Sequence, residues 1–166
     1  MPEIHQKLFI GAGAEKIYAA LTRQEGLAAW WTPGAETSAA EDLIARFPFG
    51  NGYFKEMKIT GIRPPKSVQW LCMAGSEEWM GTRLFFELEH GDKRDLLASQ
   101  PEMQDQLEQH GADEGTLLTF RHEGWKEYSA MFAECSYTWG RFLNSLKLFC
   151  ETGVGRPWPS QHDTRL

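Results

Sequence analysis

The chain has 166 residues, of which 42% are hydrophobic and 13% aromatic, which is enough apolar material for one folded domain and excludes a disordered chain. Its net charge of −6 at pH 7 argues against a nucleic-acid surface and against binding to an anionic membrane. No apolar run approaches the ~18 residues of a membrane-spanning helix, and the amino terminus lacks the pattern of a signal peptide.

The amino-terminal part predicts one strand and two short helices. Polar and apolar residues alternate over Ile4–Ile10, which is typical of a strand. Residues 14–21 place apolar side chains on one face of a short helix. Thr22 and Glu25 have the spacing of a capping box, so we expect a second short helix to reach residue 30 or 31, before a loop over residues 32–40.

The turn between the first strand and the first helix contains Gly11 and Gly13, a G-x-G that also occurs in dinucleotide-binding sites. Lys16 occupies the third glycine position of that motif, and no buried parallel strand follows to place an acid on a ribose. We therefore interpret the glycines as a flexible strand-to-helix turn.

Further segments with strand-like alternation follow along the chain. Glycine- and proline-containing turns separate most of them, and short turns between closely spaced strands favour an antiparallel meander. In the last segment Leu118, Phe120 and His122 share one face, which we expect to be the concave one. The predicted strands are residues 43–47, 53–60, 67–73, 79–89 and 116–122.

Residues 91–114 interrupt the meander with a charge-rich stretch. Ser99 is a candidate helix cap, with Pro101 in the first turn and Gly111 just past the end. Met103 and Leu107 lie four residues apart and are candidates to dock this helix on the body. We interpret the stretch as a polar surface insertion in a single domain of residues 1–166, with a lid or partner-binding element as the alternative.

The carboxy-terminal segment predicts a long helix over residues 128–152. Apolar side chains recur there at steps of three and four residues, the repeat of one helix face. Gly153 stands where a left-handed cap is expected, and Pro157 follows shortly after. A stripe this long must pack on a sheet, and it consists of Tyr128, Met131, Cys135, Trp139, Phe142, Leu146 and Phe149.

Several motifs together carry a family resemblance. They are Glu25-Gly26-Leu27-Ala28-Ala29-Trp30-Trp31-Thr32, Trp79-x-Gly81-Thr82, His122-x-Gly124-Trp125, Trp139-Gly140 and Glu151-Thr152-Gly153. With them the chain resembles the heat-shock-chaperone ATPase-activator-like branch of the START-like superfamily, also called SRPBCC domains. The resemblance covers all but residues 91–114. It implies an α+β helix-grip fold, as in the birch-pollen allergen: a curved antiparallel sheet of six or seven strands around the long helix, two short helices near the amino terminus, and a cavity between sheet and helix.

The site is predicted from strand parity and from the slimmer amino-terminal half of the helix stripe. We expect a pocket of roughly 300–1,000 Å³, the usual range for small-molecule sites. His122 is either a hydrogen-bonded structural residue or a polar anchor in that cavity. The expected ligand-binding residues are Met57, Trp70, Phe86, Phe120, His122, Tyr128, Met131 and Cys135.

Residues for catalysis or metal binding are not evident. Cys72, Cys135 and Cys150 lie in apolar patterns without C-x-x-C spacing, which favours reduced thiols and a cytoplasmic protein. A dyad of Cys135 with His122 is conceivable, but a cysteine on an apolar stripe is usually inert packing. The histidines show no paired spacing, so we expect no metal and no cofactor.

Three classes of function remain open. A binding protein for a small apolar or aromatic molecule is favoured. A chaperone ATPase activator is the first alternative, although the separate amino-terminal chaperone-binding domain of such activators is not expected in this chain. A cyclase- or hydratase-like enzyme is the second alternative, and no convincing acid–base pair supports it. The chain is expected to be a monomer or a homodimer, without nucleic-acid or membrane partners.

Overall fold

The computed structural model describes residues 1–37 and 43–165. Within these residues the strands form a six-stranded antiparallel sheet in the order β1-β6-β5-β4-β3-β2. Its strands are β1 (Ile4–Ile10), β2 (Ile44–Pro48), β3 (Phe54–Arg63), β4 (Ser67–Ala74), β5 (Arg83–Asp92) and β6 (Glu114–Glu123). The helices are α1 (Ala14–Thr22), α2 (Gln24–Trp30), α3 (Lys93–Ser99), the 3₁₀ turn η1 (Pro101–Met103), α4 (Gln104–Gln109) and α5 (Ala130–Thr152).

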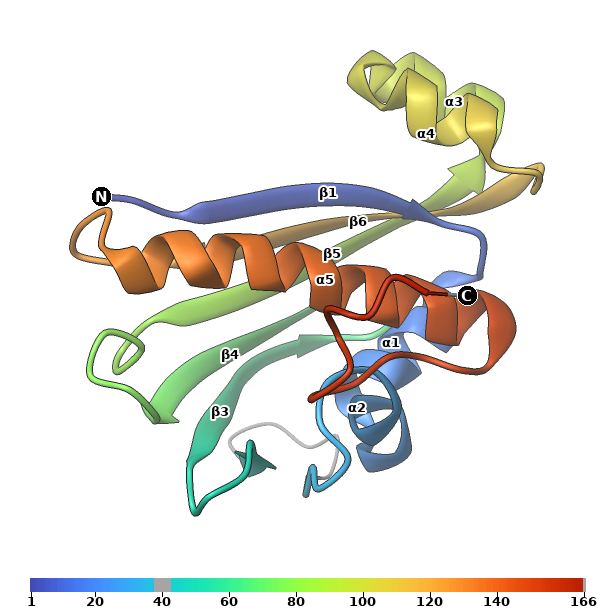
Figure 1. Ribbon diagram of the computed structural model, residues 1–166. Helices are drawn as coiled ribbons and strands as arrows, with labels where there is room; N and C mark the ends of the chain where they lie inside the picture. The colour runs from blue at the N-terminus through green and yellow to red at the C-terminus, as the bar shows by residue number, and fades with distance from the viewer. Residues whose placement is uncertain (38–42, 166) are drawn as a thin grey trace.

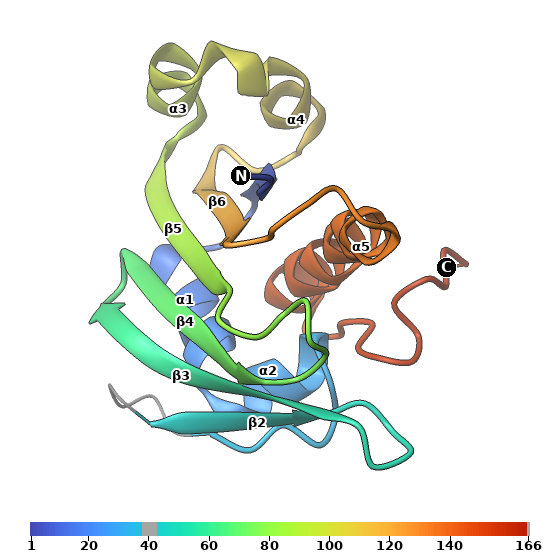
Figure 2. The ribbon, with the colours of Figure 1, turned by 90° about the vertical axis from the view of Figure 1, so that its left-hand side faces the viewer.

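The sheet curves around the long helix α5. Figure 1 shows α5 crossing the sheet along β1 and β6, and Figure 2, nearly along the helix axis, shows the strands bending around its inner side. Helices α1 and α2 lie on the same concave side and close the far end. The predicted helix-grip architecture, with two short helices near the amino terminus, is confirmed.

Both ends of α5 are defined by caps. The Ser129 side chain accepts a hydrogen bond from the Phe132 amide, and Gly153 has φ 87°, the left-handed conformation expected of a glycine cap. The predicted start at Tyr128 is wrong, because Tyr128 lies before the cap and is 81% exposed. In the first turn Phe132, not Met131, faces inward, and it packs edge-on against Trp125 at 5.3 Å.

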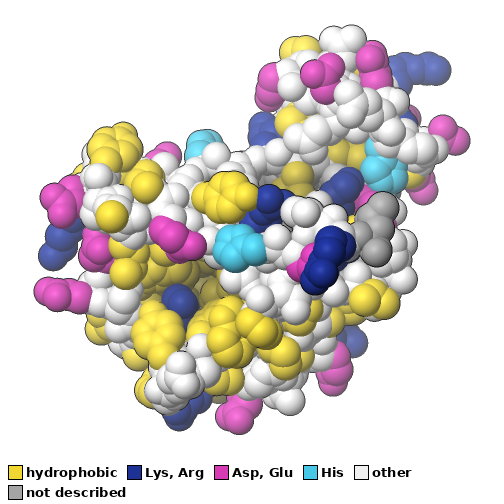
Figure 3. All heavy atoms as spheres, in the orientation of Figure 1, with side chains coloured by type: hydrophobic (Ala, Val, Ile, Leu, Met, Phe, Trp, Pro, Cys, Tyr) yellow, Lys and Arg dark blue, Asp and Glu magenta, His cyan; other side chains and the backbone are white. Residues whose placement is uncertain are grey.

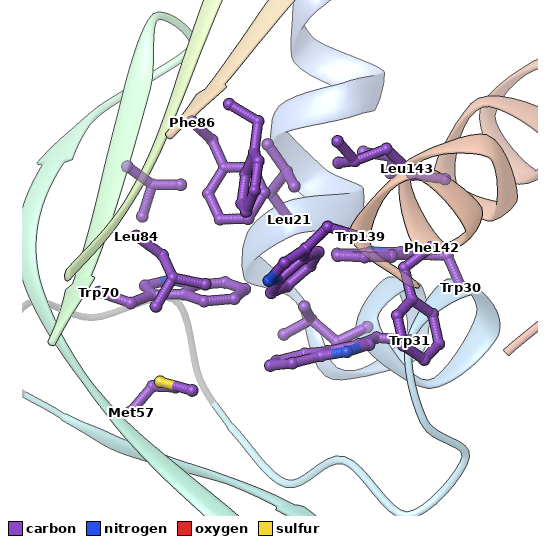
Figure 4. Close-up of a cluster of buried hydrophobic side chains, with 14 of the residues drawn as sticks. Leu21, Trp30, Trp31, Met57, Trp70, Leu84, Phe86, Trp139, Phe142 and Leu143 are labelled. Atoms are coloured by element: carbon purple, nitrogen blue, oxygen red, sulfur yellow. The ribbon is translucent and has the colours of Figure 1, made fainter. Parts of the chain in front are cut away.

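Aromatic side chains fill the space between sheet and helices. The ring centroid of Trp31, just after α2, lies 5.7 Å from that of Trp70 and 5.4 Å from that of Trp139. Side chains from strand β4 and from helix α5 therefore both pack against the Trp31 indole. Figure 4 shows these three rings pointing toward one another. The two short helices pack closely because Gly26 has no side chain: a Cβ there would lie 2.5 Å from Ala20 Cα.

Two local predictions are wrong. Trp79 was expected to begin a strand, but residues 76–82 form hydrogen-bonded turns and β5 begins only at Arg83. The expected capping box does not form either. The Thr22 hydroxyl donates to the Tyr18 carbonyl of its own helix, and Arg23 occupies the capping position of α2 without a side-chain hydrogen bond. A threonine hydroxyl can hydrogen-bond to the preceding turn of its own helix instead of capping the next helix, so the Thr-x-x-Glu spacing alone does not establish a capping box.

Residues 93–113 form a helical insertion between β5 and β6 (Figure 1, upper right). The prediction that Ser99 caps a helix is wrong, because Ser99 is the last residue of α3. Pro101 lies in the first turn of η1. Met103 and Leu107 are buried, in accordance with the predicted docking. They belong to a second small core on the outer face of the sheet, formed by Phe9, Leu96, Met103, Leu107 and Leu117.

A candidate ligand pocket

A pocket of about 300 Å³ opens beside the middle of α5. Figure 3 shows a hollow on this face, walled by hydrophobic side chains, with atoms of a basic side chain inside it. Most of the lining is aromatic. The residues that line it are Trp31, Phe49, Tyr53, Lys55, Trp79, Glu134, Cys135, Thr138, Trp139, Phe142, Trp158 and Gln161.

The pocket forms where separate parts of the chain meet. Helix α5 supplies Cys135 and Trp139, one helical turn apart, on the face that turns toward the sheet. The turn between β2 and β3 supplies Phe49 and Tyr53, and the turn before β5 supplies Trp79. These aromatic residues lie outside the strand alternation, so the turns rather than the sheet face build the mouth of the pocket.

The segment after α5 forms another wall. The Trp158 amide donates to the Trp31 carbonyl at 2.8 Å, and the Trp158 ring lies edge-on to Phe49 at 6.0 Å. Further along, Gln161 lines the pocket, and its buried Oε1 has no hydrogen-bond partner among the described residues. A buried acceptor of this kind is normally met by water or a ligand.

Lys55 is the basic group of the pocket. Its ammonium nitrogen lies 4.1 Å from the centre of the Phe49 ring, 4.6 Å from that of Trp79 and 4.9 Å from that of Tyr53. Burial lowers the pKa of this amine from its ordinary 10.5 to about 8. The rings offset part of the cost of removing the charge from water, since cations are attracted to aromatic faces.

His122 is a structural residue and not a polar anchor of the pocket. Its ring is fully buried, Nδ1 accepts a hydrogen bond from Trp139 Nε1 at 3.2 Å, and Nε2 lies 2.8 Å from the Thr82 hydroxyl. An accepting Nδ1 leaves the proton on Nε2, which therefore donates to Thr82. Thr82 in turn donates to the Trp79 carbonyl at 2.6 Å. Burial, with a smaller contribution from the Lys55 charge, lowers the pKa of His122 to about 3.

The conceivable dyad of Cys135 and His122 is not formed. The Cys135 thiol accepts a hydrogen bond from Trp79 Nε1 at 3.4 Å, and both nitrogens of His122 are engaged elsewhere. Burial raises the pKa of Cys135, the opposite of what a nucleophilic thiol needs.

Within residues 1–37 and 43–165 no group of three or more histidines, cysteines or acids is placed to hold a metal ion. No helix of the described residues is long and apolar enough to span a bilayer.

The expected ligand-binding residues are distributed differently from the pocket. Of these eight residues, Cys135 alone lines the pocket that the described residues form. Met57, Trp70, Phe86, Phe120 and His122 are fully buried in the packed core around it. Tyr128 and Met131 are exposed, because the helix begins later and in a different phase than expected.

Sequence reasoning missed Lys55, Phe49 and Trp158 as pocket residues. One signal for Lys55 was available: it has the same strand parity as Met57 and Ile59, whose side chains are both buried inside the sheet. Another signal is Trp158 between Pro157 and Pro159, of which the sequence analysis uses Pro157 alone, as a helix stop. For Phe49 and Trp31, a sequence pattern gives no indication of which turn will fold over the helix.

A curved antiparallel sheet around a long carboxy-terminal helix, with an aromatic pocket beside that helix, defines this chain as a helix-grip domain of the START-like class. Residues 12–151 match the family described as Activator of Hsp90 ATPase homolog 1-like protein. The chain belongs to that family.

Solved structures agree. The Aha1 dimer from Colwellia psychrerythraea is 33% identical, with a TM-score of 0.74 over 93% of this chain and 100% of that one. A Bacillus halodurans protein is 18% identical, with a TM-score of 0.65 over 91% of this chain and 98% of its own. A Staphylococcus saprophyticus protein is 12% identical, with the same TM-score of 0.65, and coverage is 94% and 97%. The latter two show the fold alone. None of the curated proteins matches this sequence.

Proposed function

We propose that this protein binds a small apolar or aromatic molecule in the pocket beside α5. The observation that carries the proposal is the pocket itself, about 300 Å³ and walled mainly by aromatic rings. Small-molecule sites are typically apolar concavities of this size with a few polar groups that orient the ligand. Here Lys55, Glu134, Thr138 and Gln161 are those groups.

Cys135 gives a direct test, because its side chain lines the pocket and points from α5 toward Trp79. The native protein is expected to bind anilinonaphthalene sulfonate at one site, with increased dye fluorescence. Cys135→Trp fills the space and is expected to abolish the binding. Ala133→Trp introduces the same ring at an exposed position of the same helix and should leave binding unchanged. Undiminished binding by a folded Cys135→Trp protein would place the dye elsewhere and refute the pocket as its site.

The family gives a second candidate function, stimulation of a heat-shock chaperone ATPase. Membership of the Activator of Hsp90 ATPase homolog 1-like family and the 33% identity to the Colwellia Aha1 structure favour it. Saturable stimulation of a bacterial heat-shock chaperone's ATPase would support this candidate, and no change over a wide concentration range would refute it.

The Colwellia structure is described as a dimer, so a homodimer is a candidate assembly that sedimentation tests. The three free cysteines support a reducing, cytoplasmic location.

A further inference from the structure

The strand that carries Lys55 places its side chain on the inner face of the sheet. Residues of one parity along a strand share a face, and Met57 and Ile59 of β3 are buried inside at 0% and 2% exposure. Lys55 continues this row at the end of β3 nearest the pocket. A lysine thus occupies an inward position where packing alone favours an apolar residue.

The Lys55 charge has no anionic partner among the described residues. Neither an ion pair nor a hydrogen bond joins its ammonium group to a carboxylate there, and its close neighbours are the rings of Phe49, Tyr53 and Trp79. Glu134 lines the same pocket, but its carboxylate accepts a hydrogen bond from the Thr138 hydroxyl at 2.6 Å and makes no ion pair with Lys55.

The neighbouring thiols do not supply an anion either. The titratable groups whose charges would raise the pKa of Lys55 are Cys135, Cys72 and, with the smallest effect, Glu134. Burial raises the pKa of Cys72 to about 11 and also raises that of Cys135, so both remain neutral thiols near pH 7. A half-buried cation that pairs directly with no carboxylate destabilises the folded protein, and an anion brought by a ligand would offset that cost.

We infer that the ligand of this pocket is an aromatic or similarly flat apolar acid, whose carboxylate or equivalent anion pairs with the Lys55 ammonium group while its body packs on the surrounding rings. This inference rests on the proposed function and adds the chemical class of the ligand. Lys55 is then the residue that selects acids over neutral molecules of the same shape. The low polarity of the pocket strengthens such a pair relative to one in water.

A pair of shape-matched probes separates charge from shape. 2-Naphthoate and 2-naphthamide have the same ring system, but only the first is an anion at pH 7. Binding is measured by calorimetry and by the fluorescence of the tryptophans that line the pocket. We expect the native protein to bind naphthoate at least about tenfold more tightly than naphthamide, a difference of about 1.4 kcal/mol.

Variants assign the preference to one residue. Lys55→Met keeps an apolar stem of similar length and is expected to remove the tenfold preference while changing naphthamide affinity little. Lys55→Arg keeps the charge and should retain part of the preference. Lys126→Met removes an exposed positive charge that does not line this pocket, and both affinities should stay unchanged.

The pH profile of the native protein gives an independent readout that needs no variant to fold. Lys55 must be protonated to pair with an anion, and its pKa in the free protein is about 8. Naphthoate affinity should therefore be highest below about pH 8 and fall by about tenfold in all as the pH rises past about 8 to 9, where Lys55 becomes neutral, whereas naphthamide affinity should not change.

The outcomes distinguish the two proposals. If neither probe binds the native protein, the proposed function and this inference both fail. If the two probes bind equally, with no pH dependence near 8 and no effect of Lys55→Met, the pocket still binds aromatic molecules and the selection of acids by Lys55 is refuted.

Discussion

His122 shows at the residue scale how a polar group can serve packing. On a strand face where an apolar residue packs well, the imidazole instead connects Trp139 of α5 to Thr82 before β5. Every polar atom of the ring has a partner, so its burial costs little and fixes the positions of the neighbouring indoles. His122 faces inward, as its strand parity predicts, but it does so to hold Trp139 and Thr82 and not to anchor a ligand.

The neutral state of His122 predicts a pH dependence of stability. In the folded protein its pKa is about 3, whereas in the unfolded chain it is near 6.5. Between these values the unfolded state binds more protons, so His122 adds stability above pH 6.5 that is lost as the pH falls toward 3. The free energy of unfolding should decrease by up to about 1.4 kcal/mol per pH unit in this range.

His122→Asn is the reference for that experiment, because it removes the titrating group while carboxylates titrate equally in both proteins. Urea unfolding at pH 7, 6 and 5 should show the stability difference between the two proteins shrinking as the pH falls. A constant difference would mean that His122 is already protonated in the folded state or is not buried as the structure has it.

At the scale of elements, α5 is organised by its buried face. Trp139 is 2% exposed and contacts Trp31, Phe120 and Trp79. Trp139→Ala is expected to lower the free energy of unfolding by roughly 3–5 kcal/mol, the range for a large aromatic side chain removed from a core. Arg141→Ala, which loses contacts to Tyr137 near the surface, should cost under about 0.5 kcal/mol. Equal denaturation midpoints for the two variants would contradict this assignment of the helix face.

Gly140, in the middle of α5, is a second test at this scale. A glycine inside a helix is often needed where a backbone or bulky ring approaches closely, but at Gly140 the nearest atoms to an added Cβ belong to the Gln6 side chain, at 3.4 Å or more. That distance is ordinary contact, so Gly140→Ala should gain helix propensity and raise stability by about 0.5–1 kcal/mol. Gly26→Ala is the contrasting variant, since its Cβ would lie 2.5 Å from Ala20 Cα and should destabilise the protein. A destabilised Gly140→Ala variant would show that Gln6 cannot yield.

Periodicity predicted the elements well because the strands and α5 each turn one face toward the main core, and of the described strands only β1 and β6 are also buried on the outer face, under the insertion. Val68, Trp70 and Cys72 of β4 alternate with half-exposed residues, as the sequence indicates. The pocket could not be predicted this way. Phe49, Trp79 and Trp158 lie in turns or after the last helix, where no repeat fixes the direction of a side chain. The start of α5 was misplaced for a related reason, since Tyr128 matches the apolar repeat but precedes the Ser129 cap.

On the scale of the whole molecule, the insertion contacts β1 through hydrogen bonds of Gln106 and Gln100, and it is joined to the domain at two further places. One is the outer core of Phe9, Leu117 and the insertion's own apolar residues. The other is Glu151 of α5, whose carboxylate lies 2.8 Å from His110 Nε2 and 3.0 Å from Lys147 Nζ. Burial opposes ionisation of Glu151, but hydrogen bonds from the Gly11 amide and from Lys147 outweigh it, and its pKa lies below the usual value. The main core under α5 does not include the insertion.

We therefore predict that the domain folds without the insertion. Asp92 and Glu114 are directly paired at the ends of β5 and β6, so residues 93–113 can be replaced by Asn-Gly, a two-residue hairpin turn. The deletion exposes Phe9 and Leu117, which are 0% and 1% exposed in the intact protein. Losing their burial should cost roughly 1.5–3 kcal/mol each. Cooperative unfolding should persist, with a lowered denaturation midpoint.

A second deletion variant separates loss of folding from simple exposure of apolar surface. Phe9→Thr and Leu117→Thr on the outer face of the sheet keep strand propensity and remove the exposed apolar patch. In the shortened chain these substitutions should improve solubility, whereas in the full-length chain the same pair should destabilise the docked insertion. The measurements are urea unfolding and binding of anilinonaphthalene sulfonate, whose proposed pocket lies on the other face of the sheet. If the shortened, polar-faced protein shows no cooperative transition, the insertion is required by the fold, and the division into a helix-grip body with an accessory is wrong.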